Sequence, residues 1–138
     1  MLSLALGSIA CLALVACATR TAAERHPAAV AVDGLLRLRR ARSTDAAAYA
    51  RYLEDSSVAT QLAEGSTEAS GPPLPKWNRP YVSAATTSTA SVVVVWRGTS
   101  AFAEWPYATR FGMRRSGGRW RVVDAETLKR GDVPPPLR

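Results

Sequence analysis

Side chains able to perform covalent or metal chemistry are few in this 138-residue chain. The only cysteines, Cys11 and Cys17, both lie in an apolar segment at its start, and His26 is the single histidine. Zinc is bound mainly by several cysteine or histidine side chains, so the sequence excludes such a site after residue 17. A disulfide scaffold is excluded there for the same reason. We therefore expect neither a metal ion nor a cofactor.

Residues 1–19 contain no charged side chain, and the first is Arg20. An uncharged apolar run of this kind is typical of a targeting or anchoring segment. Within it, Leu14-Val15-Ala16-Cys17 resembles the lipobox of bacterial lipoproteins, in which the cysteine after the cleavage site carries a diacylglycerol. The resemblance implies a signal peptide over residues 1–16, lipidation of Cys17 and a tether over residues 17–26.

A lipidated Cys17 implies a domain anchored at the extracytoplasmic face of the cell membrane by its acyl chains. Two alternatives stay open. One is ordinary secretion after cleavage. The other is an uncleaved membrane anchor, for which Arg20 and Arg25 on the C-terminal flank favour a cytoplasmic domain.

The next part of the chain predicts helices. Apolar residues recur at helical spacing from Pro27 to about residue 40, with Asp33 and Arg37 as a favourable i,i+4 pair. A second helix is expected after Ser43-Thr44, whose hydroxyls suit an N-cap, and a short third helix from Ser57 to Gly65. Residues 66–80 contain four prolines and predict a long loop.

Past Pro80 the apolar period changes to two. Strands are expected over 81–88, 90–97, 107–115 and 119–127, with Phe111 and Met113 facing inward, and residues 128–138 form a proline-rich extended tail. Helices followed by four antiparallel strands predict an α+β fold with the helices packed on one face of the sheet. The domain is expected to span residues 27–127.

The closing hairpin, Gly118-Arg119-Trp120-Arg121-Val122-Val123-Asp124, resembles that of the nuclear transport factor 2-like superfamily. This resemblance, over residues 27–127, implies a cone-shaped domain whose curved four-stranded sheet wraps around the first helices. The order of elements is most similar to secreted and lipoprotein members. A related possibility is an assembly subunit resembling cone-fold domains of secretion and conjugation systems.

Some members of this superfamily are enzymes that use a carboxylate base in the cone pocket. Tyr49 and Tyr52, with Asp124 or Glu104 near the rim, are the groups that such a lyase or isomerase could use here. No catalytic motif of the superfamily matches this chain, so the enzyme is the alternative and a non-catalytic domain is the prediction. A cone filled by Trp96, Phe111, Met113 and Trp120 would favour the non-catalytic domain. An enclosed cavity with a carboxylate near a tyrosine would favour the enzyme.

Two of the four tryptophans are candidates for binding. Trp96 and Trp120 alternate with polar residues and predict core packing, whereas Trp77 and Trp105 lie in loops beside prolines. Pro106 restricts Trp105 to extended conformations, which lowers the entropy lost when the indole docks. We expect a contact surface for a ligand or partner formed by Trp105, Phe102 and Trp77, with Tyr52 as a further candidate. In the alternative, Trp105 folds inward and seals the base of the sheet.

Basic residues number 18 and acidic residues 11, which gives a formal net charge of +7. Arginines cluster at the end of the first helix, where cations complement the helix dipole, and in the last hairpin. A leader that exports the domain argues against nucleic acid, and anionic lipid head groups suit a tethered domain better.

The predicted function is that of a membrane-tethered, non-catalytic accessory or binding domain of the bacterial cell envelope. Its expected contacts are the membrane and either an envelope protein partner or a small apolar ligand. A homodimer formed through the outer face of strands 90–97 and 107–115 is a further expectation.

Overall fold

The computed structural model describes residues 19–68, 73–102 and 104–138. The predicted signal peptide and Cys17 lie outside these residues. Within the part of the chain that is described, no helix is both long enough and apolar enough to cross a bilayer. The fold is α+β, with helices preceding a mostly antiparallel open sheet, as the order of helical and strand patterns predicted.

Residues 19–68 form four α-helices: α2 (Ala22–Arg25), α3 (Pro27–Arg40), α4 (Ala46–Ala50) and α5 (Ser56–Glu68). The predicted first helix is confirmed as α3, with Pro27 at its start and the Nδ1 of His26 accepting a hydrogen bond from the Ala28 N–H at 3.1 Å. Pro27 suits this position because its missing N–H would have no partner in the first turn.

The caps of the two following helices differ from the prediction. Asp45, and not Ser43 or Thr44, caps α4, since its carboxylate accepts from the Ala47 N–H at 3.0 Å. The Asp55 carboxylate likewise accepts from the Ser57 N–H at 2.9 Å, so that Ser57 lies inside α5. A carboxylate both satisfies a free N–H and complements the helix dipole. The predicted end at Gly65 is wrong, because α5 continues to Glu68.

The sheet contains five strands: β1 (Lys76–Trp77), β2 (Tyr81–Ala85), β3 (Thr89–Arg97), β4 (Ala108–Ser116) and β5 (Arg119–Leu128). β3, β4 and β5 are neighbours, and β1 and β2 both pair with β3, β1 near its end and β2 near its start. The predicted four strands are therefore present, and β1 is a fifth, inside the predicted loop over residues 66–80. Short 3-10 turns cover Thr99–Ala101 and Arg130–Asp132.

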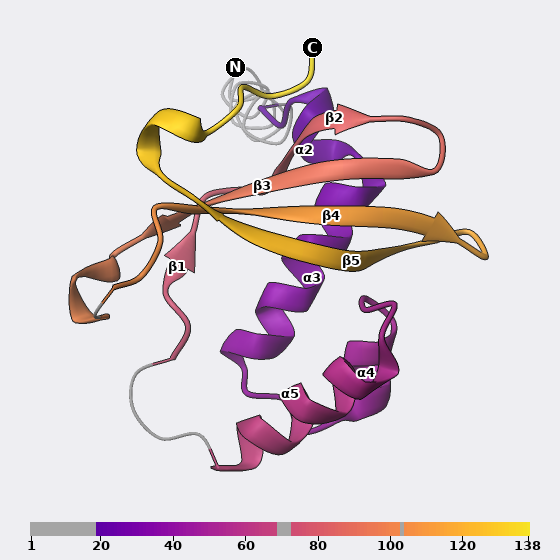
Figure 1. The fold of residues 1–138 in the computed structure, drawn as a ribbon, viewed down its shortest axis with the longest axis vertical. Coiled ribbons are helices and arrows are strands. Elements are labelled where there is room, and N and C mark those ends of the chain that lie inside the picture. Colours follow the sequence, from indigo (N-terminus) through magenta and orange to yellow (C-terminus); the bar gives the residue numbers. More distant parts are fainter. Residues whose placement is uncertain (1–18, 69–72, 103) are drawn as a thin grey trace, which may run out of the picture.

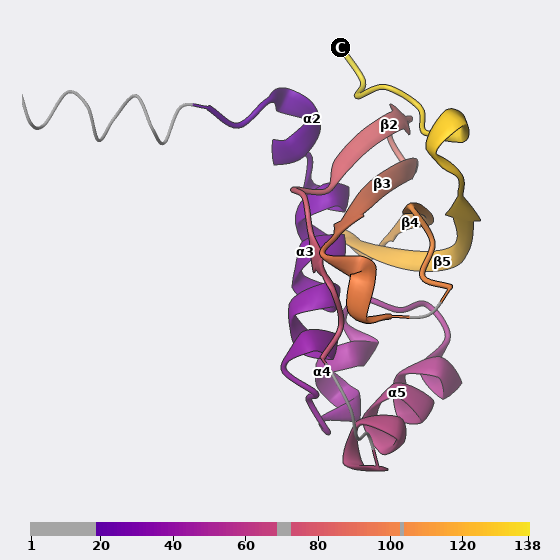
Figure 2. The ribbon, with the colours of Figure 1, turned by 90° about the vertical axis from the view of Figure 1, so that its left-hand side faces the viewer.

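Helix α3 crosses one face of the sheet and packs against β2, β3 and β5, as Figures 1 and 2 show. The core between them is built from alternating strand residues and the inner side of α3. It includes Val32, Leu36, Val82, Val92, Val94, Trp96, Phe111 and Met113. Phe111 and Met113 thus face inward as predicted, and Trp120 packs half-buried against the same cluster.

Helices α4 and α5 extend beyond the sheet and form a second cluster with the end of α3 (Figure 1). The segment between them is fixed to β5, because the Val122 N–H donates to the Tyr52 carbonyl at 2.7 Å and the Glu54 N–H donates to the Val122 carbonyl at 3.1 Å. Leu53 and Val122 form a parallel bridge at this point. This attachment holds α5 opposite β5 and leaves a pocket between them.

Both segments predicted to flank the domain pack onto it. Residues 17–26 were predicted to be a tether, yet Ala22–Arg25 form α2, in which Ala23 is only 3% exposed. The predicted extended tail returns to β2, where the Leu137 N–H donates to the Val82 carbonyl at 2.8 Å and the Tyr81 hydroxyl donates to the Pro134 carbonyl at 2.6 Å. The folded unit therefore reaches beyond residues 27–127 at both ends.

Candidate functional site

The aromatic side chains predicted to bind a ligand or partner gather around Trp96. The Trp105 ring lies edge-on to Trp96 with a centroid distance of 5.4 Å, and Phe102 packs on Trp105 at 5.3 Å. Trp77 packs on Trp96 at 6.3 Å. Tyr52 is not part of this group, because it packs against α3 at Gly34. Three of the four predicted residues are thus brought together through Trp96.

Trp105 is half-buried and turned toward the core. Its Nε1–H is buried and finds no hydrogen-bond partner among the described residues, whereas the Trp96 Nε1–H donates to the Thr109 hydroxyl at 2.9 Å. This geometry is the one expected for a tryptophan that seals the base of the sheet. A contact role for Trp105, with Phe102 beside it, stays a prediction.

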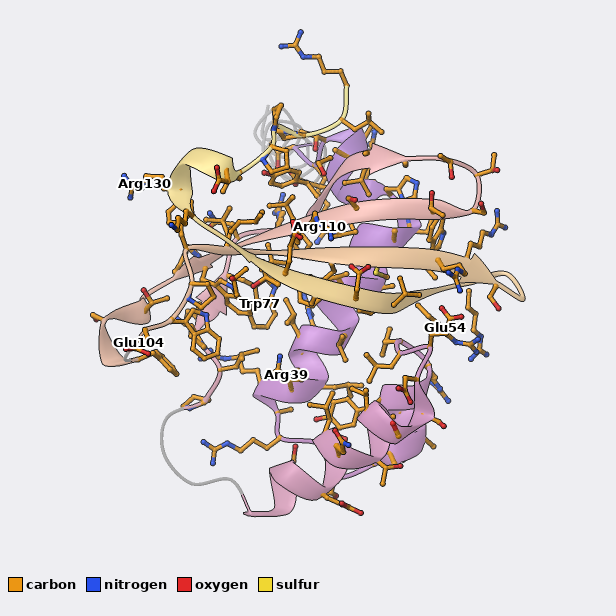
Figure 3. All side chains as sticks on the ribbon, viewed as in Figure 1. Arg39, Glu54, Trp77, Glu104, Arg110 and Arg130 are labelled. Carbon is orange, nitrogen blue, oxygen red and sulfur yellow. The ribbon has the colours of Figure 1, made fainter. Side chains whose placement is uncertain are left out.

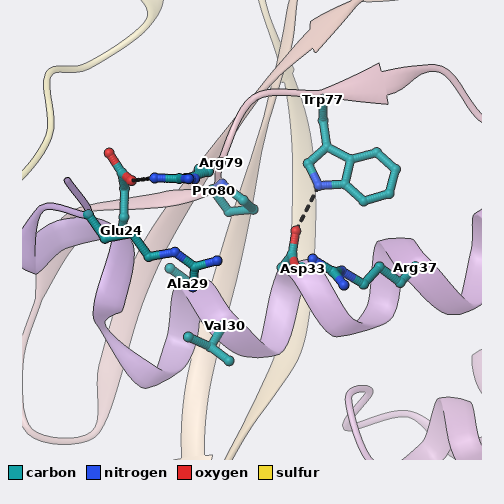
Figure 4. A pocket seen from close by; sticks show the side chains of 9 residues that line it. Glu24, Ala29, Val30, Asp33, Arg37, Trp77, Arg79 and Pro80 are labelled. Carbon is teal, nitrogen blue, oxygen red and sulfur yellow. Dashed lines mark hydrogen bonds and ion pairs between the residues drawn. The ribbon is translucent and has the colours of Figure 1, made fainter. Parts of the chain in front are cut away.

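Trp77 also lines a surface cleft of about 500 Å³ beside α2 and α3 (Figure 4). The cleft combines charged side chains with a small apolar floor. Its lining residues are Arg20, Glu24, Ala29, Val30, Asp33, Arg37, Trp77, Arg79 and Pro80. It is therefore a mixed-charge site with three guanidinium groups and two carboxylates.

Asp33 organises this cleft. One carboxylate oxygen accepts from the Trp77 Nε1–H at 2.9 Å and the other from the Arg37 Nε–H at 2.8 Å. Arg79 lies 3.7 Å from the Glu24 carboxylate. The i,i+4 pattern on α3 predicted the Asp33–Arg37 pair, but nothing in the local sequence predicted that Trp77, 44 residues away, shares the same carboxylate.

A second pocket, of about 350 Å³, lies between α3, α5 and β5. Its walls are mainly apolar. The residues that line it are Leu35, Arg39, Leu53, Asp55, Val58, Leu62, Phe111, Val122, Val123, Asp124 and Ala125. Because the bridge at Leu53 fixes α4 and α5 to β5, the pocket is part of the fold and needs no rearrangement to form.

Arg39 is the basic residue that lines this pocket, and Figure 3 shows it on the part of α3 that extends past the sheet. Burial lowers the pKa of its guanidinium, an effect that the nearby Tyr49 partly opposes. Within the described residues, the Arg39 side chain forms no hydrogen bond or ion pair.

The two carboxylates that line the pocket are engaged elsewhere. Asp55 accepts from both the hydroxyl and the N–H of Ser57, hydrogen bonds that hold the pKa of Asp55 below its usual value. Asp124 accepts from Arg110 at 3.3 Å. The positive charge of Arg39 is therefore not neutralised by either of them.

The groups named for an isomerase are separated. The Tyr49 hydroxyl donates to the Leu38 carbonyl at 3.3 Å and its side chain is fully buried in the α4–α5 cluster. Glu104 lies in the connection between β3 and β4, apart from Arg39 (Figure 3), and does not line the pocket. Trp96, Phe111, Met113 and Trp120 fill the space between α3 and the sheet.

Comparison with known proteins found no matching family model, no matching curated protein and no matching solved structure. The proposed function therefore rests on the sequence and on the geometry of the fold, the pocket and the cleft. The pocket supplies a cation that has no ion-pair partner among the described residues and lies beside apolar side chains, and the cleft supplies paired charges at the surface.

Proposed function

We propose that this chain is a membrane-tethered, non-catalytic binding domain of the bacterial cell envelope, and that the pocket beneath β5 binds a small ligand with an apolar body and an anionic head. The observation that carries the proposal is the unpaired Arg39 guanidinium in a pocket otherwise lined mainly by apolar side chains. The Arg39 side chain is half-buried, and partial removal of a charge from water costs free energy unless the charge is paired.

A carboxylate or phosphate supplies the missing partner, because both match the two parallel N–H groups of a guanidinium. The apolar part of the ligand would contact Leu35, Val58 and Phe111 on the facing walls. A volume of about 350 Å³ falls at the lower end of the range of small-molecule sites, roughly 300–1,000 Å³. The ligand class we propose is therefore a medium-chain amphipathic anion.

We further propose that the domain is a member of the nuclear transport factor 2-like superfamily. Support comes from the order of helices and strands, from α3 packed along one face of the sheet, and from the predicted closing hairpin, which forms the β4–β5 turn. The tether proposal is supported by the lipobox-like residues 14–17 and by the uncharged run over residues 1–19.

Ligand binding is tested by calorimetry with decanoate and with the uncharged decanol. We expect the wild-type protein to bind decanoate, and Arg39→Met to bind it about 10- to 100-fold more weakly, as for loss of one hydrogen bond to a charged group. Decanol affinity should stay unchanged, because the apolar walls are intact. Arg119→Met, which removes the same charge from the exposed β4–β5 hairpin, is the matched control. Equal decanoate affinity in wild type and Arg39→Met would refute the pocket proposal.

The tether is tested by Cys17→Ser. We expect this variant to move from the membrane to the soluble fraction or to accumulate unprocessed, because the thiol that accepts the lipid is gone. The measurement is cell fractionation combined with metabolic labelling by a radioactive fatty acid. Membrane retention at mature size in the variant, with no lipid label on the wild type, contradicts lipidation.

A further inference from the structure

The surface cleft of Figure 4 lies where the chain leaves the apolar segment. Arg20 lines the cleft and is the first charged residue after residues 1–19. Arg20 lies three positions after Cys17 in the sequence, and three steps of fully extended chain span at most about 10 Å. A lipidated Cys17 therefore holds Arg20 close to the head groups, and an uncleaved anchor ending at residue 19 would do the same.

The cleft carries exposed side chains of the types that are common where proteins contact membrane surfaces. The side chains of Arg37 and Arg79 are 71% and 54% exposed, and Val30 of α3, which also lines the cleft, is 52% exposed. Trp77 places its indole in the same cleft (Figure 4), and tryptophan is enriched at membrane–water interfaces.

The charge balance also favours an acidic lipid surface. All 18 basic and 11 acidic residues lie after residue 19, so the net charge of +7 belongs entirely to the part of the chain beyond the apolar segment. In the Arg37–Asp33 and Arg79–Glu24 pairs the arginine side chains are largely exposed, whereas the carboxylate side chains are only 28% and 23% exposed. A phosphate can therefore bind the exposed guanidinium groups beside their carboxylate partners through two parallel hydrogen bonds.

We propose that this cleft rests on the membrane that holds the chain, with Arg20, Arg37 and Arg79 binding the phosphates of acidic phospholipids and with Trp77 and Val30 at the interface. The inference rests on the proposed tether and extends it, since it assigns the face of the domain that is turned toward the lipid. It is independent of the pocket near Arg39, which lies farther along α3 toward its C-terminal end.

The experiment uses the full chain reconstituted into vesicles of phosphatidylcholine, alone or mixed equally with phosphatidylglycerol, that carry a head-group spin-labelled lipid. Flotation reports the tether, and quenching of tryptophan fluorescence by the label reports the cleft. We expect stronger quenching in the phosphatidylglycerol vesicles, weakened by high salt because screening reduces surface electrostatics. Trp77→Phe should remove this additional quenching.

The arginines are tested by Arg37→Gln/Arg79→Gln, with Arg115→Gln/Arg119→Gln as a control of equal charge change on exposed residues of the β4–β5 hairpin. Each basic residue near an acidic surface is worth roughly fivefold in affinity. We therefore expect the cleft variant to need roughly 25-fold more phosphatidylglycerol for the same quenching and the control to behave as wild type. Two results overturn the inference while the tether stands. In one, the protein floats but its quenching does not depend on phosphatidylglycerol or on Trp77. In the other, the two double variants behave alike. Failure to float with either vesicle refutes the tether and the inference with it.

Discussion

Trp96→Ala is expected to lower the free energy of unfolding by about 3–5 kcal/mol. The Trp96 side chain is 7% exposed and contacts both Trp77 and Trp105 edge-on. Its removal leaves a cavity at the point where β1, β3 and the following connection meet. It also deprives the Thr109 hydroxyl of its indole donor. Urea unfolding at equilibrium, followed by circular dichroism, measures the difference.

Trp105→Ala is the informative comparison. Trp105 packs on one side of Trp96 and is itself half-buried, so its truncation should cost less than that of Trp96. Wild-type stability in Trp96→Ala would show that the aromatic group does not support the core. Near-normal stability in Trp105→Ala, combined with loss of partner or ligand binding, would support the contact role predicted for Trp105 and Phe102.

Gly34→Ala is expected to destabilise the protein by about 1–3 kcal/mol, although alanine is the better helix former by about 1 kcal/mol. An added Cβ at Gly34 would lie 2.7–2.9 Å from the Oη, Cζ and Cε1 atoms of Tyr52. The Val122 N–H bond to the Tyr52 carbonyl fixes the Tyr52 main chain, and the ring packs against the α4–α5 cluster, so making room for the Cβ disturbs that packing. Steric overlap therefore outweighs the gain in helix propensity.

Gly65→Ala is the matched control for this substitution. Gly65 also lies within a helix, α5, but an added Cβ there meets nothing within 4 Å. Gly65→Ala should therefore raise the free energy of unfolding by up to about 1 kcal/mol. Thermal unfolding of the two variants and the wild type measures the change in stability that each substitution causes. The expectation for Gly34→Ala fails if it stabilises the protein as Gly65→Ala does, or if adding Tyr52→Ala leaves its cost unchanged.

The apolar periods were sufficient to predict the layers of this fold. The helical period from Pro27 predicted α3, and the strand period predicted that Phe111 and Met113 face the core. β1 was missed because two residues, Lys76 and Trp77, are too few to show a period. The caps at Asp45 and Asp55 were missed because the neighbouring hydroxyls of Ser43, Thr44 and Ser57 are equally plausible acceptors in a sequence.

The sites were harder to predict because they depend on long-range contacts. The sequence predicted the same role for all the arginines at the end of α3, namely that their charges complement the helix dipole. In the structure each has a different environment. Arg37 binds Asp33, Arg40 donates to the Leu74 carbonyl, and Arg39 lines the apolar pocket. Only the position of β5 and α5 around the helix distinguishes them, and no pattern within residues 27–40 contains that information.

The return of the C-terminal tail to β2 affects how the protein can be labelled. Helix α2 also packs against β2, so the described N-terminal end and Arg138 lie at the same end of the molecule (Figure 1). A fluorescent or affinity domain fused after Arg138 would emerge near the anchor and compete with the membrane for space. The β4–β5 turn is the better insertion point, because Gly117 and Gly118 are exposed and link two neighbouring strands.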